Sequence, residues 1–82
     1  KSPDFRIGND YYEMKSYEGK FKSSKLSHMI KNGSEQSDRV VIQLKGNVNM
    51  SDLLNKINGI GKVADLKSLI VIEENGTVHI IK

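Results

Sequence analysis

The chain has 82 residues, of which 28% are charged and 37% hydrophobic, and its formal net charge is +3. This composition indicates a small soluble globular domain with a modest core, and it excludes an intrinsically disordered chain. No apolar run approaches the roughly 18 residues of a membrane-spanning helix, so we expect no stable membrane association of this domain. The chain has no cysteine, which excludes disulfides and thiolate metal sites.

The chain begins Lys1-Ser2 without a methionine. We therefore expect upstream sequence to be missing. On this interpretation residues 1–82 are a single domain from the C-terminal part of a longer protein.

Residues 3–17 have the pattern of a β-hairpin. Apolar residues alternate with polar ones on both sides of the turn residues Gly8-Asn9-Asp10. These apolar residues are Phe5, Ile7, Tyr12 and Met14. The loop can consist of Gly8-Asn9 or of Asn9-Asp10, or it can have three residues.

The loop length decides which side chains share a face of this hairpin. With either two-residue loop, Asp4 pairs with Glu13 or with Lys15, and all three side chains leave the same face. A three-residue loop would put Asp4 opposite Met14 instead. A two-residue loop therefore predicts a site of two carboxylates and one ammonium group.

A helix is expected next, beginning near Lys25 with Ser23 or Ser24 as its N-cap. Leu26, Met29 and Ile30 lie at the i, i+3 and i+4 spacing of one apolar stripe. The helix ends at Asn32-Gly33 or runs on through Gln36.

Two β-branched runs, 40–44 and 69–72, predict buried strands. A helix capped by Ser51 lies between them, and this arrangement favours a parallel crossover. Asn75-Gly76 predicts a turn into a last strand at 78–81. The order is ββαβαββ, so we expect an α/β fold with a mixed sheet flanked by helices.

Five lysines crowd the segment 15–31, in which Glu18 is the only acid, so its local charge is +4. They are Lys15, Lys20, Lys22, Lys25 and Lys31. A nucleic-acid backbone is the natural partner for such a segment. The alternative is an ordinary solvated loop and helix face.

The hairpin carboxylates suit phosphodiester chemistry. Asp4 and Glu13 on adjacent strands could hold a Mg²⁺ ion while substrate phosphate completes its shell. Lys15 could orient an attacking water or stabilise charge on the phosphorus. The alternative is a surface ion cluster contributing about 0.2–1 kcal/mol per pair.

Two further groups have open roles. His28 could act as general acid or base in metal-free RNA cleavage, although an ordinary exposed helix histidine is the alternative. The aromatic residues near the hairpin could stack on an unpaired base, but half-buried packing is the expected role. These aromatic residues are Tyr11, Tyr12, Tyr17 and Phe21.

Pro3-Asp4 followed by Glu13-Met14-Lys15 resembles the Pro-Asp…(Asp/Glu)-x-Lys signature of the restriction-endonuclease-like nucleases. The blocks 1–7, 37–44 and 66–72, the last followed by Asn75-Gly76, resemble the C-terminal tRNA nuclease domain of bacterial contact-dependent growth-inhibition toxins. The similarity extends over nearly the whole chain.

This resemblance implies a restriction-endonuclease-like core and an RNase that is delivered from a secreted or cell-surface protein. It would act in the target-cell cytoplasm, be neutralised by a cognate immunity protein and, in some members, be assisted by a translation elongation factor. Family members usually carry a helix ahead of the Ser-Pro-Asp block, and we expect it to be lacking here. A DNA endonuclease of the same superfamily, and a non-catalytic module binding nucleic acid or protein through its lysines, are the alternatives.

Overall fold

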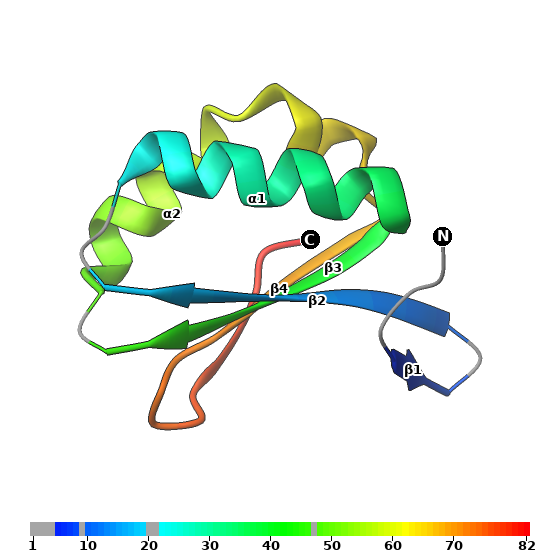
Figure 1. Ribbon diagram of the computed structural model, residues 1–82, viewed down its shortest axis with the longest axis horizontal. Helices are drawn as coiled ribbons and strands as arrows, with labels where there is room; N and C mark the ends of the chain where they lie inside the picture. Colours follow the sequence, from blue (N-terminus) through cyan, green and yellow to red (C-terminus); the bar gives the residue numbers. More distant parts are fainter. Residues whose placement is uncertain (1–4, 9, 20–21, 47) are drawn as a thin grey trace.

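The computed structural model describes residues 5–8, 10–19, 22–46 and 48–82. Their elements follow the order β1 (Phe5–Ile7), β2 (Asp10–Glu18), α1 (Ser23–Gln36), β3 (Arg39–Lys45), α2 (Met50–Asn58), the 3-10 helix η1 (Gly61–Asp65), β4 (Ser68–Ile72) and β5 (Val78–Ile80). The strands form one sheet in the order β1-β2-β3-β4-β5, and the helices lie on one face of it (Figure 1). The predicted ββαβαββ order is confirmed.

The sheet is mixed because two of its strand pairs are parallel and two are antiparallel. Strand β3 pairs in parallel with both β2 and β4, while β1–β2 and β4–β5 are antiparallel hairpins. Parallel neighbours require a crossover, which α1 supplies between β2 and β3 and which α2 with η1 supplies between β3 and β4. The crossover predicted between the strands at Val40 and Leu69 is therefore confirmed.

The core lies between the helices and the face of the sheet that they cover. Its buried side chains come from α1, α2 and the three central strands, and from Leu66 directly after η1. They are Tyr17, Leu26, Ile30, Val40, Ile42, Leu44, Leu53, Ile57, Leu66, Leu69 and Val71. The apolar stripe predicted for α1 thus supplies Leu26 and Ile30, each 0% exposed, to this core.

The other face of the sheet is also apolar, but none of the described helices covers it (Figure 1). Val41 is only 1% exposed there, because its strand neighbours surround it. Ile70 and Ile72 on β4 are half-buried, and Val78 and Ile80 on the edge strand β5 are exposed. The strand predicted at residues 69–72 is therefore deeply buried on one face only.

Helix α1 begins at Ser23, before the predicted start near Lys25, and ends at Gln36, the later of its two predicted ends. Its N-cap is Lys22, which makes no side-chain capping hydrogen bond, so the predicted serine caps are wrong. The backbone N–H of Lys22 donates to the Tyr17 hydroxyl at 2.5 Å, and this contact fixes where the chain turns from β2 into the helix. Gly33 lies inside the helix, and a Cβ at this position would lie 3.0 Å from the Val40 side chain, so the close packing favours glycine here.

Helix α2 also begins before its predicted cap. Asn49, not Ser51, is the N-cap, and its side chain accepts a hydrogen bond from the Asp52 backbone N–H at 3.1 Å. An asparagine performs this role as well as a serine does. Among the described residues, no helix is both long and apolar enough to cross a membrane.

Candidate functional site

The β1–β2 hairpin has the shorter of the predicted loops. Phe5 pairs with Tyr12 and Ile7 with Asp10, so only two residues connect the strands. The first of them, Gly8, has a φ of +62°, a conformation that favours glycine. Asp4 lies outside the described residues, so the structure does not test its predicted pairing with Glu13.

Glu13 and Lys15 lie on the helix-covered face of β2. They are in register with Val40 and Ile42, which are both core residues. The Lys15 ammonium lies 3.3 Å from one Glu13 carboxylate oxygen, and the two side chains are 28% and 7% exposed. The structure therefore brings together two of the three side chains that the sequence predicted for this site.

The second carboxylate oxygen of Glu13 is buried and accepts no hydrogen bond within the described part of the chain. Glu13 is also the one charged residue there that is buried. A buried acceptor without a partner costs about 1–3 kcal/mol, and more when the group is charged. Because native structures satisfy most buried polar groups, this oxygen points to a ligand or a catalytic role.

The pair lies past the last described contact between β1 and β2. Strand β1 pairs with β2 as far as Tyr12, and the described residues provide no strand beyond it on that side. The Lys15 side chain is 28% exposed, whereas Glu13 is nearly enclosed. A carboxylate and an ammonium group placed in this way can contact a phosphate together with its counter-cation.

A cationic group of α1 lies at the C-terminal end of β2. The Lys25 ammonium donates to the Glu18 carbonyl at 2.9 Å and lies 4.6 Å from the centre of the Tyr17 ring. Lys22 is exposed next to it, whereas Lys20 lies outside the described residues. Lys25, one of the predicted lysine segment, therefore lies on the flank of α1 that is next to β2.

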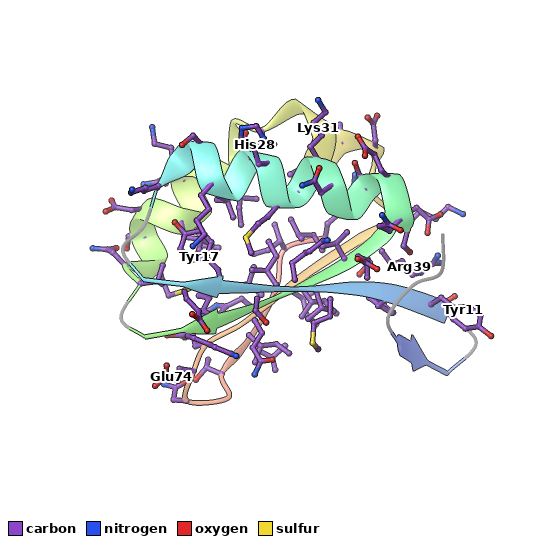
Figure 2. All side chains as sticks on the ribbon, viewed as in Figure 1. Tyr11, Tyr17, His28, Lys31, Arg39 and Glu74 are labelled. Carbon is purple, nitrogen blue, oxygen red and sulfur yellow. The ribbon has the colours of Figure 1, made fainter. Side chains whose placement is uncertain are left out.

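Lys31 and His28 lie elsewhere. Figure 2 shows both side chains on the side of α1 turned away from the sheet, where they line a pocket with Gly59, Gly61 and Asp65. Lys31 comes six residues after Lys25, which puts the two lysines on different flanks of the helix. The structure thus separates His28 from the Glu13–Lys15 pair, and its catalytic role stays a prediction.

The described residues contain no cluster of three histidine, aspartate or glutamate side chains that could hold a metal ion. Glu13 nevertheless fits a divalent cation, because its free oxygen is a hard ligand of the kind that Mg²⁺ prefers. The second predicted ligand, Asp4, lies outside the described residues. The magnesium site therefore stays a prediction.

One pair of ionisable side chains was missed by the sequence analysis. Nε2 of His79 lies 2.7 Å from a carboxylate oxygen of Glu73, and both side chains are less than a third exposed. The hairpin register that pairs Val71 with His79 puts His79 on the same face as Glu73. A two-residue Asn75-Gly76 loop would instead pair Ile72 with His79 and put Glu73 on the other face, so the turn signal alone does not reveal this pair.

The family model described as contact-dependent growth inhibition CdiA C-terminal domain matches residues 1–78. No curated protein and no solved structure matches this chain.

Proposed function

This chain belongs to the family of contact-dependent growth inhibition CdiA C-terminal domains, and we propose that it is a nuclease toxin that cleaves tRNA in target bacteria. Toxin delivery and growth inhibition come from the family. Phosphodiester cleavage rests on the Glu13–Lys15 pair of β2, and tRNA as the substrate rests on the sequence resemblance.

The observation that supports cleavage most strongly is the buried Glu13 carboxylate, which has one oxygen near Lys15 and the other without a partner among the described residues. A buried ion pair stabilises a fold less than apolar side chains of similar volume often do. A carboxylate kept in such a place is therefore better explained by chemistry than by stability.

Each residue of the proposed site has a separate role. Asp4 and Glu13 would hold a Mg²⁺ ion, which supplies charge neutralisation and an activated water when bound. Lys15 stabilises the negative charge that develops on the phosphate oxygens. His28 lies on the other side of α1, and the proposed cleavage does not use it.

Lysines along α1 would hold the nucleic acid. Lys22 and Lys25 lie at the end of β2 beyond Lys15, so they can contact phosphates on one side of the cleaved bond. We assign Lys20 to the same group from its place in the sequence. Lys31 can contact only a substrate that also reaches the outer flank of α1.

Two proteins complete the proposed function. Toxin domains of this family work with a cognate immunity protein, and we infer that the one for this chain presents acidic groups to the lysine segment. Association should then slow as salt concentration rises. A translation elongation factor is the second proposed partner, and its addition should increase tRNA cleavage.

The test is induced expression of the domain in bacteria, with tRNA integrity and genomic DNA integrity followed over time. We expect growth arrest and tRNA fragments with intact DNA for the wild type, and normal growth for Asp4→Asn and Glu13→Gln at equal protein levels. Degraded DNA with intact tRNA would instead identify a DNA endonuclease. Growth arrest by both variants would contradict the proposed site.

A further inference from the structure

The tyrosines near the hairpin differ sharply in exposure. Tyr17 is 0% exposed and Tyr12 is 8% exposed, so the predicted packing role is confirmed for both. Tyr11 is 54% exposed. Among the described aromatic residues that were candidates for base stacking, Tyr11 is therefore the one whose ring is accessible to a ligand.

Tyr11 lies next to the proposed site. It precedes Glu13 by two residues on β2, so both side chains leave the same face of the sheet, roughly 6.6–6.8 Å apart along the strand. Figure 2 shows Tyr11 at the end of β2 that the helices do not cover, whereas Tyr17 lies between β2 and α1. A group bound at Glu13 would thus have an exposed ring as its neighbour.

The backbone that carries this ring is held in place. Tyr11 pairs with Arg6 of β1, and its carbonyl accepts a hydrogen bond from the Ser37 hydroxyl at 3.0 Å. The Ser37 oxygen in turn accepts from the Arg39 backbone N–H at 3.1 Å. A ring on such a support loses little conformational freedom when a ligand stacks on it.

The residues that flank Tyr11 on β2 leave the other face of the sheet. There Asp10 lies 3.4 Å from the Arg39 guanidinium, and Tyr12 is buried. Tyr11 is thus an exposed ring on the same face as the Glu13–Lys15 pair. Such a ring suits a nucleobase, whose flat face stacks on aromatic rings while its phosphates stay among charged groups.

We propose that Tyr11 stacks on an unpaired nucleobase of the substrate, next to a phosphate that the Lys15 ammonium contacts. This inference rests on the proposed function and narrows its substrate class to unpaired nucleotides, such as those in an RNA loop. A base inside a duplex cannot offer its face to the ring, so paired segments are excluded from this position.

Binding of a short single-stranded RNA that contains 2-aminopurine tests the proposal, with EDTA present to suppress any metal-dependent cleavage. We expect quenching of 2-aminopurine fluorescence by the wild type and by Tyr11→Phe. Tyr11→Ala should lose the quenching and bind roughly five- to 150-fold more weakly, as expected for one lost stacked base. The control is Val78→Ala, because Val78 is equally exposed at 54%, and it should bind like the wild type.

The outcomes separate this inference from the proposed function. Unchanged binding and quenching in Tyr11→Ala would overturn the stacking role, and so would a wild type that binds duplex RNA as tightly as single strands. Cleavage that requires Glu13 would leave the nuclease assignment standing in either case. Stacking without cleavage by any sample would instead support Tyr11 as a base-binding residue and contradict the nuclease.

Discussion

Replacement of Glu13 by methionine should make the protein more stable and inactive. The carboxylate is 7% exposed, and within the described residues only one of its oxygens has a partner, at 3.3 Å. That separation is longer than the roughly 2.7–2.9 Å of a strong charge-assisted hydrogen bond, so the ion pair offsets little of the desolvation cost. Methionine has a similar shape and needs no partner.

The expected gain in the free energy of unfolding is about 1–3 kcal/mol, which is the cost of the unsatisfied oxygen. For a domain of this size, each kcal/mol corresponds to a rise of roughly 4–8 °C in Tm. The freed Lys15 ammonium subtracts little from this gain, because its side chain is 28% exposed and can turn toward water.

Lys15→Met is the matched control, since it removes the other half of the same pair. It takes the Lys15 ammonium away from the buried carboxylate, so we expect a loss of about 1–3 kcal/mol in the free energy of unfolding. The two methionine variants should therefore shift stability in opposite directions.

Urea unfolding followed by far-UV circular dichroism measures both shifts. A Glu13→Met variant that is less stable than the wild type by more than about 1 kcal/mol would refute the reasoning. The carboxylate would then be holding the fold together, and its burial would no longer point to function.

Three further predictions concern α1 and its flanks. Gly33→Ala should destabilise the protein by about 1–3 kcal/mol despite the better helix propensity of alanine, because the new Cβ would meet Val40 at 3.0 Å. Tyr17→Phe should cost about 1 kcal/mol, because the backbone N–H at the start of α1 loses its acceptor. Lys25→Gln should lower the salt dependence of single-stranded RNA binding by about 0.7 in the log–log slope, whereas Lys31→Gln on the other flank should not change it.

Each of these has its own check. Thermal unfolding of Gly33→Ala is compared with that of Asn32→Ala, an exposed position on the same helix, and a stabilised Gly33→Ala would contradict the packing argument. Thermal unfolding also measures Tyr17→Phe, for which a Tm equal to that of the wild type would show that water replaces the hydroxyl. Fluorescence anisotropy at several salt concentrations compares the two lysine variants. An equal decrease of the log–log slope in both variants would show that the RNA contacts both flanks of α1.

The element order could be predicted from the sequence because local signals specify it. Turn residues marked both hairpins, but the sequence left the loop length at Gly8-Asn9-Asp10 open, and the observed pairing of Ile72 with Val78 is not the register of a two-residue Asn75-Gly76 loop. The apolar runs at 40–44 and 69–72 marked the central strands, and a helix between them implied parallel pairing.

The details that failed depend on contacts distant in sequence. The serine cap of α1 was wrong because the Tyr17 hydroxyl, five residues earlier, receives the Lys22 N–H. Asn32-Gly33 was one of two helix ends that the sequence allowed, and only the packing of Val40 against Gly33 shows why a glycine lies inside the helix.

The separation of His28 from Glu13 likewise needed the structure, since only packing shows which side of α1 faces the sheet (Figure 2). Periodicity assigned His28 to a face other than the apolar stripe, but it could not identify the neighbours of that face. The alternation of residues also could not show that Tyr11 is exposed and Tyr12 buried, because both exposures depend on packing against other elements.

Cleavage of purified total tRNA by the purified domain tests the central claim most directly. The wild type is incubated with Mg²⁺ or with EDTA, beside Asp4→Asn, Glu13→Gln and the control Val78→Ala. Discrete fragments from the wild type and Val78→Ala in Mg²⁺ alone, and none from the two carboxylate variants, are the result that we predict. Fragments of the same size and yield from Glu13→Gln would contradict the assignment of this site.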